Sequence, residues 1–242
     1  LSVRTTPPAG ITTTTVPGST TTTSKSSVPA IPRTGLNSAG VKKTTDGIEF
    51  TNPTYYKNPL VVEVLANQGD WLRVLVTARP NHTEGWVKAD DVVLGATDFR
   101  MELDLSTYTL RVYRAANVFL ETKVAIGKDS TPTPLGKFFM AEVIKNSSDT
   151  GIYGAYILPT NGYSETLDSF DGGLPQIAFH GTNQPELLGS KASNGCVRMA
   201  NEAVTKIAQN VPSGTPIEIF ATTPASWASG AGPSTTAAAI KG

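Results

Sequence analysis

The chain has 242 residues, which is enough for one large domain or for two smaller ones with tails. Its 20 Lys and Arg residues balance its 20 Asp and Glu residues, so the formal net charge is zero and a polyanion such as DNA is not an obvious partner. No apolar run in the sequence reaches the roughly 18 residues that a membrane-spanning helix needs. Because the chain begins with Leu1 rather than Met, we expect a mature or truncated form whose targeting segment has been removed.

Thr, Ser and Pro dominate residues 1–45, where Thr fills positions 12–15 and 20–23. Such a composition cannot bury enough apolar surface to offset the entropy lost on ordering. This segment is therefore predicted to be a disordered linker. Residues 222–242, rich in Ala, Ser and Gly, are predicted to be disordered as well.

Residues 46–95 contain short runs of β-forming residues separated by turn-forming segments, which predicts a small all-β domain. The segments Gly-Asp-Trp-Leu-Arg-Val around Trp71 and Glu-Gly-Trp-Val around Trp86 resemble bacterial SH3-like domains. That resemblance implies a small β-barrel, which serves either to bind a ligand or as a rigid spacer. His82 lies in a turn of this domain and is predicted to be an ordinary surface residue.

Residues 96–221 predict a second, larger and mainly β domain. Apolar residues alternate over 99–105 and resume at 110–112, which predicts a hairpin. One helix is predicted at 201–210, with Asn201 as its N-cap. Strands and helices do not alternate, which argues against a doubly wound sheet. Further strands are predicted at 119–126, 138–143, 176–180 and 217–220.

Cys196 is the only cysteine, so the chain cannot form an internal disulfide. The residue is either a small buried hydrophobe or a reactive thiol. Gly195 before it allows a positive φ or a close approach to a ligand. The amides of Asn194, Gly195 and Cys196 lie in a turn near a helix start, where they could converge on an oxyanion, and such surroundings are expected to lower the thiol pKa.

A thiol nucleophile benefits from a base, and the chain has two histidines. His82 belongs to the other predicted domain. His180 ends a predicted strand 16 residues before Cys196 (196 − 180) and is therefore the candidate base. A Cys and a His within one domain are not a specific signal on their own.

The wider pattern is more specific. His180-Gly181-Thr182, followed by Ser193-x-Gly195-Cys196-Val197-Arg198, resembles the signature of the YkuD-type L,D-transpeptidases. Two further segments match the family, at 131–138 and at 103–113, so the resemblance spans about residues 97–220. It implies a β-sandwich-like catalytic domain with a cradle for the substrate.

The resemblance also implies a reaction. The Cys196 thiolate attacks the carbonyl that joins an L-centre to the terminal D-Ala of a peptidoglycan tetrapeptide stem, and His180 passes the thiol proton to the leaving amine. An amine of a neighbouring stem then takes the acyl group from the thioester and cross-links the wall. Attack by water would instead make the protein a carboxypeptidase. No cofactor is implied.

One position departs from the family pattern, because Asn194 stands where a second histidine is common. Asn does not titrate, so His180 is left as the only candidate base. Arg198 is expected either to bind a substrate carboxylate or to form a structural salt bridge. Ser193 is expected to stabilise the turn, and Thr182 to line the site. Ser193, Thr182 and Tyr163 are also candidates for contacts with the substrate.

The loop 161–174, which contains Tyr163, is predicted to fold over the site as a lid, or else to be a plain surface connection. Its Asp168 and Asp171 have no further ligands at fitting spacings, so no metal site is predicted.

Two other classes of protein compete with the transpeptidase. One is a hydrolase or weakened enzyme that binds peptidoglycan, and the other is a structural wall protein in which the cysteine is inert. The substrate implies a bacterial cell envelope outside the membrane, with residues 1–45 as a tether. Carbapenems are expected as covalent inhibitors by resemblance.

Overall fold

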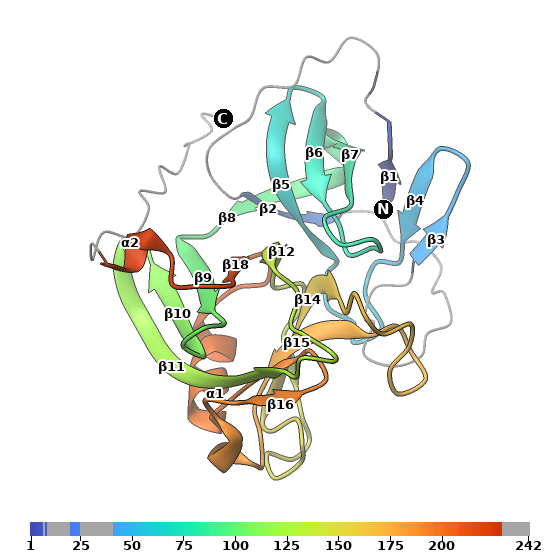
Figure 1. The fold of residues 1–242 in the computed structure, drawn as a ribbon. Coiled ribbons are helices and arrows are strands. Elements are labelled where there is room, and N and C mark those ends of the chain that lie inside the picture. The colour runs from blue at the N-terminus through green and yellow to red at the C-terminus, as the bar shows by residue number, and fades with distance from the viewer. Residues whose placement is uncertain (7, 9–19, 25–40, 229–242) are drawn as a thin grey trace.

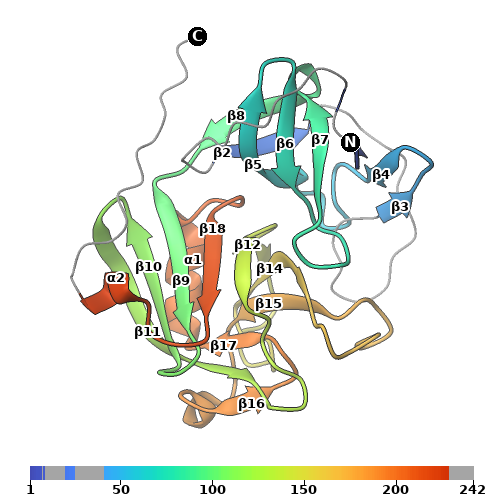
Figure 2. The ribbon, with the colours of Figure 1, turned by 45° about the horizontal axis from the view of Figure 1, so that its top comes forward.

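A computed structural model describes residues 1–6, 8, 20–24 and 41–228, which form two β-rich units (Figures 1 and 2). The mainly-β prediction is confirmed. Within the described residues, no helix is long and apolar enough to cross a membrane.

The N-terminal unit is built on one antiparallel eight-stranded sheet. A cluster of buried apolar residues that includes Phe50, Leu72 and Val87 forms its core. That this unit is an SH3-like barrel stays a prediction. In spatial order its strands are β3 (Val41–Lys43), β4 (Gly47–Phe50), β1 (Ser2–Arg4), β7 (Glu84–Lys88), β6 (Trp71–Leu75), β5 (Val61–Gln68), β2 (Thr20–Ser24) and β8 (Val92–Ala96), with the 3-10 turn η1 (Ala89–Asp91) before β8.

The prediction of disorder for residues 1–45 is wrong where the chain enters this sheet. Strand β1 pairs with β4 and β7, and Leu1 and Val3 are buried in the core. Strand β2 pairs with both β5 and β8. The composition of the whole segment hid these short pieces, since a run of β-branched Thr fits a pleated strand once partners are present. The rest of the predicted linker lies outside the described residues, apart from β3 and the residues next to these strands.

The C-terminal unit is a curled sheet around a main apolar core, with a smaller apolar cluster that includes Ala178. Met140, just after β12 (Gly136–Phe139), forms an antiparallel bridge with Thr160 of β14 (Tyr156–Tyr163), and these two strands lie near opposite ends of the strand order. In spatial order the strands are β12 (Gly136–Phe139), β18 (Pro216–Phe220), β9 (Phe99–Asp104), β10 (Thr109–Arg114), β11 (Asn117–Gly127), β17 (Val197–Met199), β15 (Gln176–His180), β14 (Tyr156–Tyr163) and β13 (Ile144–Lys145), and β16 (Lys191–Ser193) pairs with β11.

Helix α1 (Asn201–Asn210) occupies the predicted range and buries Val204 and Ile207 in the core. Its predicted N-cap is wrong, because Ala200 is the cap and Asn201 is the first helical residue. The Asn201 side chain instead accepts a hydrogen bond from Ala155 N–H (3.1 Å) and donates to the carbonyl of Thr182 (3.2 Å). It therefore ties the 146–155 hairpin to the strand that carries His180. A 3-10 turn, η2 (Pro185–Leu187), follows that strand.

The prediction of disorder from residue 222 is wrong for residues 222–228, which include the short helix α2 (Ala225–Ala228). The Trp227 indole N–H donates to Glu102 at 2.5 Å, and the Arg111 guanidinium lies 4.1 Å from the centre of its ring. A charge-assisted bond and a cation–π contact hold this segment on β9 and β10, which the composition of 222–242 did not indicate. Residues 229–242 lie outside the described part.

The fully buried Asp104 carboxylate organises one end of the sheet. Burial alone would raise the pKa of Asp104, but the hydroxyls of Ser106, Thr223 and Thr107 and the Ser106 amide donate to it and lower the pKa to about 2. We expect Asp104→Ala to destabilise the protein by about 3 kcal/mol, because several donors lose their acceptor together. Urea unfolding measures this. Asp98→Ala is the control, since the exposed Asp98–Arg114 pair should contribute less than about 1 kcal/mol.

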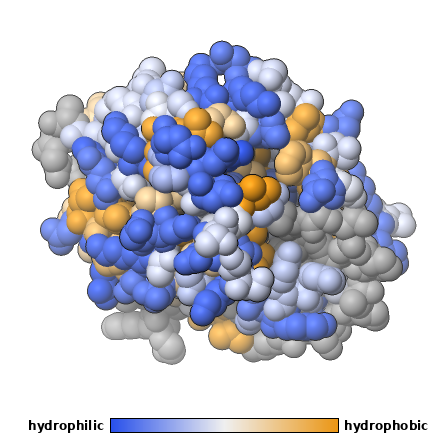
Figure 3. Space-filling view, turned by 90° about the horizontal axis from the view of Figure 1, so that it is seen from below, coloured by the Kyte–Doolittle hydropathy of each residue, from blue (hydrophilic) through white to orange (hydrophobic). Residues whose placement is uncertain are grey.

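The face of the molecule seen from below is mostly hydrophilic, with apolar residues in small scattered groups (Figure 3). Exposed apolar side chains in the C-terminal unit include Val118, Leu135 and Ile152, which lie in separate elements. Among the described residues drawn on this face, there is no broad apolar patch of the kind that marks many protein interfaces.

Candidate active site

The register of two parallel strands places the cysteine and the histidine on one face of the sheet. Strands β15 and β17 pair Phe179 with Val197, and both of these side chains enter the main core. Side chains alternate along a strand, so His180 and the cysteine side chain both point to the opposite face. Consistent with this, Cys196 joins a small apolar cluster with Ala178, on the other side from Phe179. Figure 2 shows β15 and β17 together in the C-terminal unit.

Strand β15 surrounds the sulfur with backbone groups. Cys196 Sγ lies 3.9 Å from the Gln176 carbonyl oxygen, to which the thiol donates, and it also receives the Ala178 N–H. Burial raises the pKa of the Cys196 thiol, and the Ala178 amide and the Arg198 charge offset this only in part. The predicted lowering of the thiol pKa is therefore wrong, because desolvation of the thiolate outweighs the nearby dipoles and positive charge.

His180 is held in the form that a base requires. Its ring is 3% exposed, and Nδ1 lies 2.6 Å from the carbonyl oxygen of Gly181. A carbonyl can only accept, so Nδ1 carries the proton and donates it, which leaves the lone pair on Nε2. Burial lowers the pKa of His180 to about 4, so the imidazole is neutral at pH 7.

The buried neutral histidine should make stability depend on pH. The pKa of His180 is about 4 in the folded protein, whereas the unfolded value is 6.5. Between these values the unfolded chain binds more protons, so stability is complete above about pH 6.5 and falls as the pH drops towards 4. The loss should reach about 3 kcal/mol. Denaturant unfolding between pH 7 and 4 measures it, and His180→Gln should flatten the curve over this window.

Hydroxyl groups fix the turn before the cysteine. Gly195 has a φ of +118°, the left-handed conformation predicted as possible for it. The Ser193 hydroxyl donates to the Cys196 carbonyl at 2.5 Å and accepts from Gly195 N–H at 3.1 Å, which fits the predicted turn-stabilising role. Because the Gly195 amide is thus already paired, the amides of Asn194 and Cys196 are the better candidates for holding an oxyanion.

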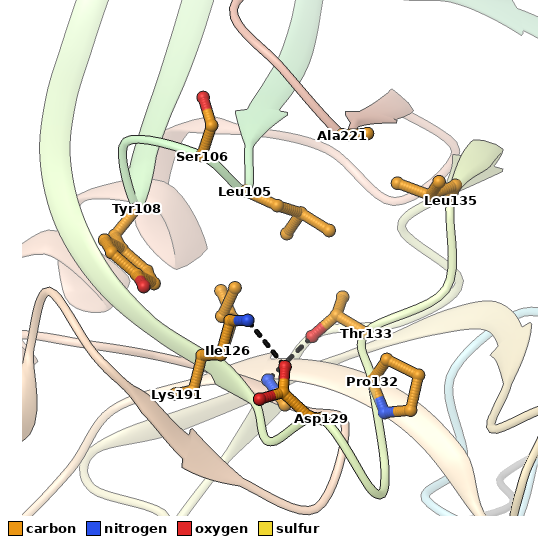
Figure 4. Close-up of a pocket in the computed structure, with 11 residues that line it drawn as sticks. Leu105, Ser106, Tyr108, Ile126, Asp129, Pro132, Thr133, Leu135, Lys191 and Ala221 are labelled. Carbon is orange, nitrogen blue, oxygen red and sulfur yellow. Dashed lines mark hydrogen bonds and ion pairs between the residues drawn. The ribbon is translucent and has the colours of Figure 1, made fainter.

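Thr133 braces the same turn, and the sequence did not single it out although it lies in the matching segment 131–138. Its hydroxyl donates to the Gly195 carbonyl at 2.8 Å and accepts from Gly127 N–H at 3.0 Å. Thr133 and Gly127 also line a cavity of about 440 Å³, with an ion pair between Asp129 and Lys191 (Figure 4). The other lining residues are Leu105, Ser106, Tyr108, Ile126, Pro132, Leu135 and Ala221.

Arg198 lies opposite His180 in the strand register and keeps donors unused. Its Nη1 lies 3.4 Å from the Gln184 side-chain oxygen, its buried Nε has no partner, and it forms no ion pair within the described residues. The Thr182 side chain is buried and accepts from Gln184 N–H, while Asn194 is exposed. The substrate-binding roles of Arg198 and Thr182 stay predictions.

Tyr163 lies away from the predicted loop surface. It is the last residue of β14, is 1% exposed, and its hydroxyl points to the carbonyl of Thr77 in the N-terminal unit. Only residues 164–174 of the segment predicted as a lid therefore follow the strand. The contact of Tyr163 with the substrate and the motion of the loop as a lid stay predictions.

Tyr153, in the 146–155 hairpin, is a site residue that no sequence pattern indicated. Its ring packs edge-on against His180, with centroids 5.1 Å apart. Burial raises the pKa of Tyr153, and the charges of Cys196 and Asp171 add to the effect. The hairpin thus borders the site. Within the described residues, no three His, Cys, Asp or Glu side chains group in a way that could hold a metal ion.

The geometry defines a protein with a partly buried cysteine and a buried, neutral imidazole on one face of a curled β-sheet. The family model of the YkuD L,D-transpeptidase catalytic domain matches residues 98–219. The chain therefore belongs to the YkuD L,D-transpeptidase family, which confirms the resemblance found in the sequence.

Several known proteins are similar to the chain. A putative L,D-transpeptidase YkuD of Bacillus licheniformis is 30% identical over 154 residues, covering 61% of this chain and 85% of that protein. The putative L,D-transpeptidase YqjB of Bacillus subtilis is 36% identical over 101 residues, with coverages of 40% and 56%. Among solved structures, an L,D-transpeptidase from Mycobacterium smegmatis aligns at a TM-score of 0.43 and 15% identity, covering 78% of this chain and 80% of that one. The E. faecium L,D-transpeptidase catalytic domain aligns at a TM-score of 0.37 and 25% identity, with coverages of 51% and 97%.

Proposed function

We propose that this protein is a peptidoglycan L,D-transpeptidase in which Cys196 is the nucleophile and His180 the base. The observation that carries the proposal is the tautomer of His180. The Gly181 carbonyl fixes the proton on Nδ1, and burial keeps the ring neutral, so Nε2 can accept a proton on the face that carries the thiol. Membership of the family supports the substrate class.

The raised pKa of the Cys196 thiol determines when the thiol loses its proton relative to its attack on the substrate. Because burial raises the pKa of Cys196, the resting cysteine is a neutral thiol rather than half of an ion pair. His180 Nε2 therefore takes the proton as Sγ attacks the carbonyl next to the terminal D-Ala. The C–N bond to D-Ala breaks, the proton passes to the leaving amine, and a thioester remains on Cys196. An acceptor amine then attacks the thioester, and the sulfur leaves and regains a proton.

The surrounding residues suit this substrate. Turn amides at Asn194 and Cys196 would hold the negative charge that develops on the carbonyl oxygen. The Arg198 guanidinium, which forms no ion pair within the described residues, would bind a stem carboxylate. A β-lactam carbonyl can acylate the same thiol, so carbapenems are the proposed covalent inhibitors. One related E. faecium catalytic domain was solved acylated by ertapenem. The location that we propose is the bacterial cell envelope outside the membrane, where peptidoglycan is found.

Mass spectrometry tests the proposal directly. The protein is incubated with a disaccharide-tetrapeptide, with Cys196→Ala as the control. Loss of D-Ala together with a cross-linked dimer, both abolished in the control, is the expected result. Loss of D-Ala without dimer would favour the alternative L,D-carboxypeptidase. If the wild-type protein releases no D-Ala, the proposed transpeptidase activity is contradicted. The alternative of a catalytically weak wall protein that binds peptidoglycan would then be favoured.

A further inference from the structure

The two units share an interface with polar anchors on both sides of an apolar contact. Leu75 of the N-terminal unit packs in one buried cluster with Phe139 of the C-terminal unit. On one side, the fully buried Glu142 carboxylate accepts hydrogen bonds from the Thr54 hydroxyl (2.5 Å) and the Asn58 amide (2.9 Å). A buried carboxylate needs such donors, so the N-terminal unit is part of the environment in which the C-terminal unit is stable.

The second anchor is a single side chain that acts like a neighbouring strand. Asn81 donates from Nδ2 to the Tyr163 carbonyl (2.8 Å) and accepts from the Tyr163 N–H through Oδ1 (2.8 Å). The amide thus satisfies both backbone groups of the last residue of β14. Two parallel bonds to one residue fix its position and its orientation. Nearby, His82 is exposed as predicted, and its ring also packs on Phe138 with centroids 5.0 Å apart.

Asn81 acts where strand pairing is irregular. Strand β14 pairs Pro159 with Ala178 and then Tyr163 with Gln176, so four steps on β14 match two steps on β15. Such bulges leave residues unpaired and change the direction of a strand, and they are common beside active sites. The pairing of Tyr163 with Gln176 is therefore the point at which the register of β15 is fixed again.

The backbone of Gln176 contacts the thiol of Cys196. Its carbonyl accepts from the Cys196 thiol, and the Ala178 N–H two residues later donates to the same sulfur. The Gln176 side chain also donates to the Thr160 carbonyl at 2.6 Å, which holds β15 against the irregular part of β14. The contacts run in sequence from Asn81 through Tyr163 and Gln176 to Cys196.

We propose that Asn81 is a positioning residue for the reaction, and that through it the N-terminal unit sets the place of Cys196 relative to His180. The proposal rests on the proposed function for its substrate. It gives the N-terminal unit a catalytic purpose in addition to any role as a spacer or wall-binding module. A displacement of about 1 Å can lower a rate about a hundredfold. Loss of the two hydrogen bonds between the Asn81 side chain and the Tyr163 backbone, called here the Asn81 clamp, is therefore expected to lower kcat.

The test compares two interface variants of the full chain, Asn81→Ala and Asn58→Ala. Both remove interface hydrogen bonds, but only the first touches the path to the cysteine. For Asn81→Ala we expect kcat for D-Ala release to fall about 10- to 100-fold with KM within about threefold of wild type. The pH midpoint for alkylation of Cys196 by iodoacetamide should rise, because the Ala178 amide that stabilises the thiolate is displaced. Asn58→Ala should keep the wild-type kcat and midpoint.

A thermal melt of each variant shows whether the protein is folded at the assay temperature. If Asn81→Ala does not fold, Asn81→Asp replaces it, since the aspartate keeps the acceptor for Tyr163 N–H and removes the bonds that Nδ2 donates to the Tyr163 carbonyl and to Glu165. It should also lower kcat with little change in KM. Wild-type kcat and midpoint in the Asn81 variant would overturn the proposal, and so would equal losses in Asn58→Ala. If the wild-type protein releases no D-Ala, the proposed function fails. The pH midpoints for Cys196 alkylation in the variants and in the wild type then still show whether the Asn81 clamp positions the thiol.

Discussion

Replacing His180 with Gln is expected to lower kcat for D-Ala release by about 10²- to 10⁴-fold, the usual contribution of a general base. The thiol pKa is raised by burial, so little thiolate forms without a base near neutral pH. Gln has a similar length and is neutral, as the buried imidazole is, so the fold should survive. Release of D-Ala, followed by mass spectrometry, measures the effect.

His82→Gln is the matched control, because it removes the only other histidine, which occupies an exposed position in the N-terminal unit. It should leave the rate unchanged.

The pH profile gives a further check. The pKa of His180 is about 4, and that of the thiol lies above its ordinary value, so the rate should stay level from about pH 5 to beyond neutrality. An acid limb near pH 6.5 would show that the imidazole is hydrated in the working enzyme, and an unchanged rate in His180→Gln would contradict its role as base.

Local patterns predicted the elements whose stability is local. Alternation over 99–105 corresponds to β9, and the period of 201–210 corresponds to α1, because the apolar side chains of each pattern enter the main core. The motif around His180 and Cys196 indicated the family. The parallel pairing of β15 with β17 then puts both side chains on one face, a step that needs the tertiary structure.

What the sequence could not show depends on partners far away in the chain. Strand β2 exists through pairing with β5 and β8, so its own polar composition carried no sign of it. Tyr153 reaches His180 from a hairpin that has no periodicity. The thiol pKa was misjudged for a similar reason, since a turn motif indicates nearby amides, while burial is decided by distant segments packing over the sulfur.

The turn glycine offers a second large effect, in Gly195→Ala. A φ of +118° is strained for any residue with a Cβ, at a cost of about 1–3 kcal/mol, and the new Cβ would also lie 2.9 Å from Ile177 Cδ1. We expect the turn to relieve the strain by moving. The amides of Asn194 and Cys196 would move with it, and the loss of one oxyanion donor lowers kcat about 10²- to 10³-fold.

Gly189→Ala separates strain from displacement of the turn. Gly189 also has a positive φ, +87°, but a Cβ there meets nothing within 4 Å, and the residue lies outside the cysteine turn. Both variants should lose stability in urea, whereas only Gly195→Ala should lose D-Ala release. Iodoacetamide reacts at sulfur without needing an oxyanion hole, so alkylation of Cys196 in Gly195→Ala should fall far less than acyl transfer. A parallel fall in both reactions would mean that the substitution disturbs the thiol itself, and the amides of this turn would then lose their assigned part in stabilising the oxyanion.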